Sequence, residues 1–333
     1  MTRFLRVARL ACVPLMLTLA GGAVAQSFPS RTMSLMVPYP AGGLSDVIAR
    51  TVAPQLSKGV GQSVIVENLA GAGGSVAAQK VLNTAADGHV LYQGSPNELI
   101  LTPMVLSSVK YKSEDWRMVQ MIGAFPMAVL ARKGLAANTI DELVELARKQ
   151  TAAGKPLSYG SVGIGSFYHV VGAHFAHLIG AEMTHIPYKG GAPMFQDMGG
   201  ENVDLAFFVV GESTLALADQ GRLKVLATMA PSGKVEAEFL RRFPAVNDSK
   251  SVKDFAFNTW TGFFVRKDTP EPVVQALNKS LASAMSDPGI KASLQKIGGD
   301  VPAMMSLDDA RREYEAQTAR FRAIARSIKL EAQ

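Results

Sequence analysis

The stretch "VPYPAGGLSDVIAR", residues 37–50, ends an apolar run with two glycines and a small hydroxyl residue, just before a helical pattern. Glycine weakens helices and strands, so a pair here serves a turn, a close packing contact or a ligand. Later stretches share this plan of apolar strand, glycine-rich turn and helix: "ENLAGAGGSVAAQK" (67–80), "YGSVGIGSFYHVVGAHF" (159–175) and "HIPYKGGAPMFQDM" (185–198). The repeated plan predicts strand–helix units of an α/β protein.

Apolar β-type runs alternate with helical periodicity along most of the chain, which predicts parallel-rich sheets flanked by helices on both faces. The expected strands cover residues 33–37, 63–68, 89–93, 117–123, 126–132, 156–160, 183–188, 203–210, 223–229 and 261–267. Helices are expected to begin near residues 44, 75, 139, 271 and 306. Pro54 should bend or shorten the first of them, because proline lacks the N–H that the helix uses.

Two stretches indicate how the chain is divided into domains. "MVQMIGAFPMAVLARKG" (118–134) joins one strand to a second strand that ends in basic residues. The chain from "LKVLATM" (223–229) to "WTGFFVRKDTP" (260–270) repeats this arrangement. We interpret the two stretches as the outward and return crossings between two lobes. The predicted domains are residues 26–124 with 231–333, which form a discontinuous first domain, and residues 125–230.

The first 25 residues are typical of a cleaved signal peptide. Arg3, Arg6 and Arg9 precede a short Leu/Ala-rich run, and Ala23-Val24-Ala25 offers a small-x-small cleavage site after Ala25. We therefore expect the protein to be exported to the periplasm. The only cysteine, Cys12, lies in this segment, so the mature chain has no disulfide and no thiolate chemistry.

Charge and motifs exclude several classes of function. The formal net charge is +6 with the three signal-peptide arginines included, and no Lys/Arg cluster indicates nucleic acid as a partner. "GAGGSV" has Val76 where a dinucleotide-binding motif has its third glycine, and no phosphate-binding G-x-x-x-x-G-K-[ST] occurs. Neither Ser161 nor Ser166 has the G-x-S-x-G context of a hydrolase, and H-E-x-x-H is absent. We predict no enzyme activity, no catalytic residues, no metal and no cofactor.

Anion binding by the glycine-rich turns is consistent with these exclusions. Unpaired N–H groups and the helix dipole make a helix start attractive to an anion, and such turns line the crevice beyond the carboxyl ends of the strands. Several residues keep a second interpretation. The glycines can simply tighten turns, Asp46 can cap its helix, Lys189 can be solvated, and His169 can serve helix packing. For His174 and His177 we favour packed or surface roles over a metal site.

The motifs in this order, with "VDLAF" (203–207) following them, resemble the Bug family, the extracytoplasmic solute receptors of tripartite tricarboxylate transporters. The resemblance implies a periplasmic binding protein of type II topology whose two α/β lobes close like a Venus flytrap around a small organic carboxylate. It also implies integral-membrane transporter subunits as partners, and we expect a monomer. The ligand-binding residues implied by the family's loops are Tyr39, Gly43, Ser45, Asp46, Ala72, Gly73, Gly74, Ser95, Ser161, Gly165, Ser166, His169, Tyr188, Lys189 and Gly190.

The chain departs from the family pattern over residues 230–258, where "PAVNDSKSVKDF" replaces a Pro-Thr-x-x-Glu pattern. Two other functions share the predicted lobes and cleft. One is a ligand-sensing receptor for a membrane sensor kinase, and the other is a periplasmic enzyme that acts on a carboxylate.

Overall fold

The computed structural model describes residues 28–233 and 238–328, and the predicted signal peptide lies outside this range. The strands are β1 (Met33–Val37), β2 (Val64–Asn68), β3 (Val90–Gly94), β4 (Trp116–Arg132), β5 (Leu157–Ser161), β6 (Met183–Pro187), β7 (Leu205–Val209), β8 (Leu223–Thr228) and β9 (Asn258–Arg266). The helices are α1 (Leu44–Val60), α2 (Ser75–Leu82), α3 (Thr102–Val105), α4 (Ile140–Ala152), α5 (Phe167–Ile179), α6 (Gly191–Gly199), α7 (Glu212–Asp219), α8 (Glu271–Met285), α9 (Pro288–Lys296) and α10 (Leu307–Ser327).

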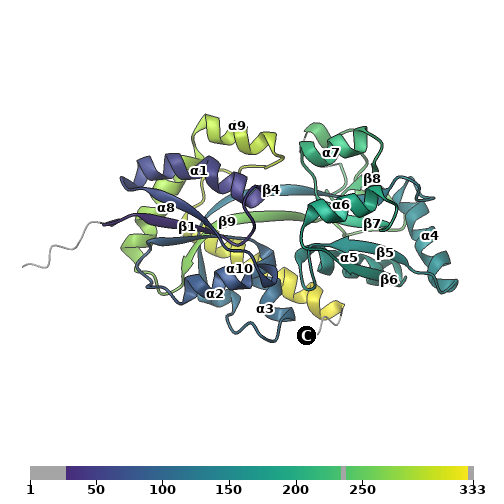
Figure 1. The fold of residues 1–333 in the computed structure, drawn as a ribbon, viewed down its shortest axis with the longest axis horizontal. Coiled ribbons are helices and arrows are strands. Elements are labelled where there is room, and N and C mark those ends of the chain that lie inside the picture. Colours follow the sequence, from purple (N-terminus) through teal and green to yellow (C-terminus); the bar gives the residue numbers. More distant parts are fainter. Residues whose placement is uncertain (1–27, 234–237, 329–333) are drawn as a thin grey trace, which may run out of the picture.

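The elements form two halves that lie side by side (Figure 1). In the first half β2, β1 and β3 run parallel, and β9 pairs antiparallel with both β3 and β4. Helices α1, α8 and α9 contribute to the core on one face of this sheet, and α2 and α10 contribute to the core on the other. The predicted α/β class with a helix-flanked sheet is confirmed.

The second half is built on the distal part of β4. There β7 and β8 pair antiparallel with β4, while β5 runs parallel to β7 and β6. Helices α4 and α5 pack on one face of this sheet, and α6 and α7 pack on the other. In the described residues no helix combines the length and the apolar character needed to cross a bilayer.

The outward crossing between the halves is one continuous strand, β4, where the sequence predicts two strands over residues 117–123 and 126–132. Its residues from Trp116 to Pro126 pair with β9, and from Met127 onward it pairs with β7. Pro126 lies where one partner replaces the other. A proline is accommodated there because the ladder does not depend on its missing N–H. In Figure 1 both β4 and β9 run across the junction of the halves.

Helix α1 is not shortened at Pro54, one of the two effects that the sequence predicts; it continues to Val60. Val52, Ala53 and Leu56 are buried on both sides of the proline. Their burial against the sheet and α8 offsets the hydrogen bond that Pro54 cannot make.

The described residues of the connection from β8 to β9, from 238 onward, pack on the second half. The Phe255 ring lies 5.2 Å from that of Phe175 and 6.0 Å from that of Phe207. The N–H groups of Lys250 and Ser251 donate to the Asp141 carboxylate at 3.2 and 2.8 Å. The sequence interpretation assigned this segment to the first domain. From the packing we propose instead that the second domain extends to about residue 257 and that the chain returns along β9.

Candidate ligand-binding site

Three of the glycine-rich turns leave the first helical turn without a side-chain cap. Helices α1, α2 and α6 begin after Gly43, Gly74 and Gly190, and none of these residues supplies a capping hydrogen bond. Side chains cap some of the other helices, since Thr139 caps α4, Asp287 caps α9 and Ser306 caps α10, whereas α7 and α8 also begin without a side-chain cap. N–H groups in the first turn of an uncapped helix can bind an anion, although the N–H of Ser75 in α2 already donates to the Ala72 carbonyl.

Asn97 links three of the turns. It lies in a π-helical turn, η2 (Asn97–Leu101), that follows β3. Its Nδ2 donates to the Tyr39 hydroxyl and to the Gly73 carbonyl, both at 2.9 Å. Its Oδ1 accepts from the N–H of Phe167, the first residue of α5, at 3.0 Å. The turns after β1, β2 and β5 therefore meet at one asparagine, although only the first two belong to the first half.

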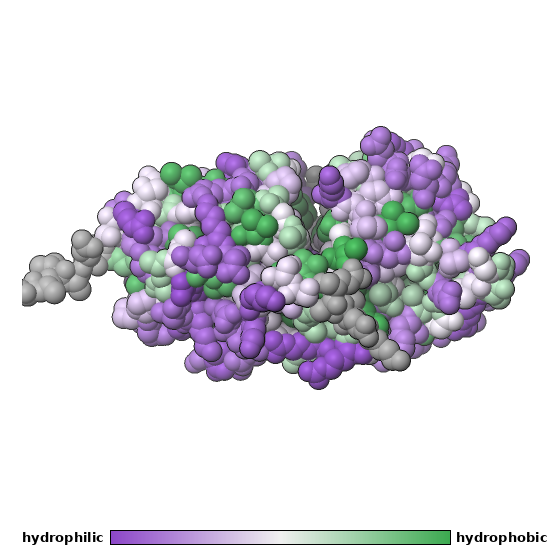
Figure 2. All heavy atoms as spheres, turned by 60° about the horizontal axis from the view of Figure 1, so that its bottom comes forward, coloured by the Kyte–Doolittle hydropathy of each residue, from purple (hydrophilic) through white to green (hydrophobic). Residues whose placement is uncertain are grey.

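The turn after β6 joins this group through β5. The N–H of Tyr188 donates to the Ser161 carbonyl at 2.8 Å. Seen from another side, the surface is hollowed between the two halves (Figure 2). The four turns that the sequence singles out are thus connected through a chain of hydrogen bonds.

Glu98, beside Asn97, is buried completely. Its carboxylate accepts hydrogen bonds from the hydroxyls of Tyr39 and Ser95, both at 2.8 Å, and from the N–H of Ser95. Burial raises the pKa of Glu98 to about 7. Sequence reasoning missed both Asn97 and Glu98. A lone acid within the apolar run "NELIL" (97–101) was the signal that could have identified Glu98.

At two positions in these turns, close packing leaves room only for glycine. Gly74 has φ +92°, and a Cβ there would lie 2.9 Å from the Cβ of Glu98. Gly165 has φ +73°, and a Cβ there would lie 2.8 Å from the Cβ of Val105. A side chain fits neither the backbone conformation nor the space. At these positions the glycines bring the turns against the η2–α3 segment.

The turn after β5 is held by a pair of stacked imidazoles. The rings of His169 and His185 are 3.9 Å apart, and His185 Nε2 lies 2.6 Å from Ser161 Oγ. Burial, and then the charge of His169, lowers the pKa of His185 to about 4, and burial lowers the pKa of His169. Both rings are therefore neutral near pH 7. Ser161 has no exposed surface, so in this structure its hydroxyl shapes the turn and cannot reach a bound solute.

The predicted site residues divide by exposure. Solvent reaches Tyr39, Gly43, Ser45, Ala72, Gly73, Ser95, His169, Tyr188, Lys189 and Gly190. Asp46, Gly74, Ser161, Gly165 and Ser166 are buried. His185, which sequence reasoning also missed, is partly buried. The exposed set supplies the surface of the candidate site, and the buried set supports it.

Two of the predicted side chains are engaged within their own turns. Asp46 Oδ2 accepts from the N–H of Gly42 at 2.8 Å and from Arg50 Nε at 3.0 Å. The Tyr188 hydroxyl donates to Asp197 Oδ2 at 2.8 Å. Asp46 therefore braces the loop ahead of α1, close to the capping role that the sequence left open.

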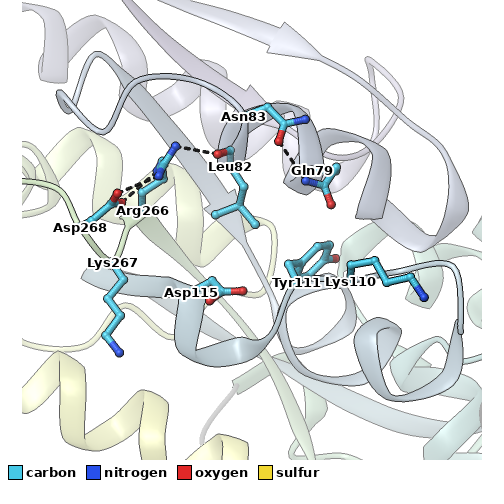
Figure 3. Close-up of a pocket in the computed structure, with 9 residues that line it drawn as sticks. All are labelled: Gln79, Leu82, Asn83, Lys110, Tyr111, Asp115, Arg266, Lys267 and Asp268. Carbon is cyan, nitrogen blue, oxygen red and sulfur yellow. Dashed lines mark hydrogen bonds and ion pairs between the residues drawn. The ribbon is translucent and has the colours of Figure 1, made fainter.

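A separate hollow of about 430 Å³ lies away from the glycine-rich turns, between α2, the chain before β4 and the end of β9. In Figure 3 Arg266 points toward Asp268 and the Leu82 carbonyl. It forms an ion pair with Asp268 at 2.7 Å and donates to Leu82 at 2.6 Å. None of the predicted site residues lines this hollow, and Arg266 connects the end of β9 to the end of α2.

Comparison with known proteins identifies the family. The model of the tripartite tricarboxylate transporter family receptor matches residues 48–330. A UPF0065 protein from Agrobacterium vitis is 33% identical over 276 residues, which cover 82% of this chain and 76% of that protein. A UPF0065 protein from Bordetella pertussis is 30% identical over 335 residues, which cover 100% of both chains.

Solved structures agree with this family assignment. The structure titled R. palustris Rpa4515 with adipate has a TM-score of 0.81 at 27% identity and covers 92% of this chain and 100% of its own. The periplasmic binding protein BugD has a TM-score of 0.77 at 27% identity, with the same coverage. The fold is that of periplasmic binding proteins, and the chain belongs to the tripartite tricarboxylate transporter receptor family, the Bug family, as its motifs predicted.

Proposed function

We propose that the protein is an extracytoplasmic receptor that binds a small carboxylate between its two halves and delivers it to a membrane transporter. The observation that carries this proposal is the set of uncapped helix starts at Gly43, Gly74 and Gly190, in turns linked by hydrogen bonds. The adipate in the structure of Rpa4515 supports a carboxylate as the ligand class.

In this proposal backbone N–H groups at the starts of α1 and α2 hold a ligand carboxylate on the first half. The start of α6, with Lys189 and the capped turn before α5 beside it, approaches the ligand from the second half. A hydrogen bond to a charged group contributes about 1.5–3 kcal/mol. A few such bonds reach micromolar affinity, about −8 kcal/mol, after the cost of association. The ligand favours the closed arrangement because only that arrangement supplies both sets of donors.

The first experiment is a thermal-shift screen of the exported chain, residues 26–333, refolded to remove any ligand carried through purification. The panel contains adipate, citrate, other dicarboxylates, acidic amino acids and aromatic acids. A ligand at 100 times its dissociation constant stabilises the folded state by about 2.7 kcal/mol, which moves the melting temperature by several degrees. A shift with one class of acid supports the receptor, and no shift with any acid contradicts it.

Delivery to a transporter needs its own measurement. Cells that lack the gene should lose uptake of the radiolabelled acid found in the screen, and the wild-type gene should restore it. Normal uptake in the deletion strain, together with loss of a transcriptional response to the acid, would favour the sensor-kinase alternative instead.

A further inference from the structure

The buried carboxyl group of Glu98 has no positively charged partner. Among residues 28–233 and 238–328, no lysine, arginine or histidine forms an ion pair with it. Its hydrogen-bond donors are the neutral groups of Tyr39 and Ser95. A buried carboxylate without an opposite charge is costly, and it relieves that cost by taking up a proton.

The titratable groups that face Glu98 are also neutral. They are tyrosines from several elements, and burial followed by the Glu98 charge raises the pKa of each. They are Tyr39 after β1, Tyr92 on β3, Tyr111 before β4, Tyr168 on α5 and, with smaller influence from Glu98, Tyr314 on α10. None of them ionises near neutral pH. Glu98, with a pKa raised to about 7 by burial, is therefore the group of this cluster that exchanges a proton there.

Glu98 also lies directly beneath the candidate site. Its carboxylate accepts from Tyr39 of the first turn, and its Cβ packs against Gly74 at the start of α2. A ligand carboxylate on the N–H groups of that helix start would bring a second negative charge next to Glu98. When two carboxylates share a site, the pKa of one of them rises strongly.

We propose that Glu98 takes up a proton when a carboxylate binds, and that this proton turns the Tyr39 hydroxyl from Glu98 toward the ligand. The inference rests on the proposed function and specifies how that site couples binding of an anion to uptake of a proton. Ionised Glu98 accepts the hydrogen bond that the Tyr39 hydroxyl donates, so this hydroxyl cannot donate to a ligand. Protonated Glu98 can donate its own O–H to the oxygen of Ser95 or Tyr39, which leaves the Tyr39 O–H free for the ligand. The receptor then binds its anion together with one proton.

Calorimetry with adipate, or with the acid that gives the largest thermal shift, tests the proposal. Titrations in phosphate and in Tris, which differ in ionisation enthalpy, give the protons taken up on binding. The wild-type protein should take up about half a proton at pH 7 and more at pH 8, because Glu98 is then ionised before binding. Its affinity should fall by as much as about tenfold per pH unit above pH 7.5.

Glu98→Gln is the decisive variant, since glutamine keeps the shape and is permanently neutral. It should bind without this proton uptake and with an affinity that stays level from pH 7 to 8.5. The matched control is Glu114→Gln, an exposed glutamate paired with Arg322, which should retain wild-type uptake. Proton uptake that persists unchanged in Glu98→Gln overturns the proposal.

A ligand-free measurement separates this proposal from the proposed function. The melting temperature of Glu98→Gln minus that of the wild type should increase from pH 5 to 7 and level off above pH 7. The sign follows because a raised pKa favours folding at low pH and loses that advantage as the pH rises through 7. A flat difference overturns the titration of Glu98. If no acid of the panel binds, the ligand linkage fails together with the proposed function.

Discussion

The side-chain oxygen of Asn97 accepts a hydrogen bond of 3.0 Å from the backbone N–H of Phe167, 70 residues further along the chain. One asparagine of the first half thus caps the first turn of a helix in the second half. Its amide nitrogen at the same time holds the first and second turns through Tyr39 and Gly73. This buried amide therefore helps to fix the relative position of the two halves at the candidate site, together with the packing of Gly165 against Val105.

Asn97→Ala should destabilise the protein by about 2–3 kcal/mol, because it leaves buried backbone and hydroxyl groups without partners. Urea unfolding followed by circular dichroism measures the loss. Asn83→Ala, at an exposed asparagine bonded to Gln79, is the control and should cost less than about 1 kcal/mol. Equal losses in the two variants would show that Asn97 does not hold the turns together.

Ser166→Ala should separate capping from ligand binding. Ser166 caps α5 through the His169 N–H at 3.3 Å, and Ser306 caps α10 through the Asp309 N–H at 3.1 Å. Either replacement by alanine should cost about 1 kcal/mol of stability without unfolding the protein. Only Ser166→Ala should weaken binding of the acid in calorimetry. Unchanged affinity would remove Ser166 from the site.

Gly74→Ala tests whether the second turn requires close packing. The added Cβ would meet Glu98 and Pro38 at 2.9 and 3.1 Å in a residue whose φ is +92°. Strain and overpacking together should cost about 2–4 kcal/mol in chemical denaturation. Gly154→Ala is the matched control, since Gly154 has φ +68° and an added Cβ there would have nothing within 4 Å, and it should cost only about 1–2 kcal/mol. A cost no larger than the control's would refute the packing argument.

His185 should make the stability of the folded protein decrease as the pH falls below 6.5. Its pKa is lowered to about 4, so its contribution to stability is present above pH 6.5 and is lost as the pH falls from 6.5 to 4. The loss should be about 1–3 kcal/mol, with allowance for the solvent contact that the ring retains. In melting curves from pH 4 to 7, His185→Phe should have a weaker dependence on pH than the wild type. His177→Phe, at an exposed position on α5, should keep the wild-type dependence.

Local patterns in the sequence are sufficient for the strand–helix units and their glycine-rich turns. Apolar periodicity predicts β1, β3, β5 and β8 close to their observed bounds, because burial on both faces of a sheet requires continuous apolar strands. The motifs also identify the family. Pro54 misleads, since burial on both sides of it compensates for the hydrogen bond that proline removes locally, and the helix is not shortened there.

The tertiary structure alone decides which residues meet across the chain. Asn97 and Glu98 belong to no recognised motif, and His185 only begins one, and they act through contacts with residues as distant as Tyr39, Phe167 and Ser161. Their roles depend on burial and on donor geometry, which single-sequence periodicity does not encode. The sequence by itself determined the strand–helix units, the family and the glycine-rich turns of the candidate site. Only the folded chain decided which buried polar groups lock those turns together, because that choice depends on contacts between residues far apart in the chain.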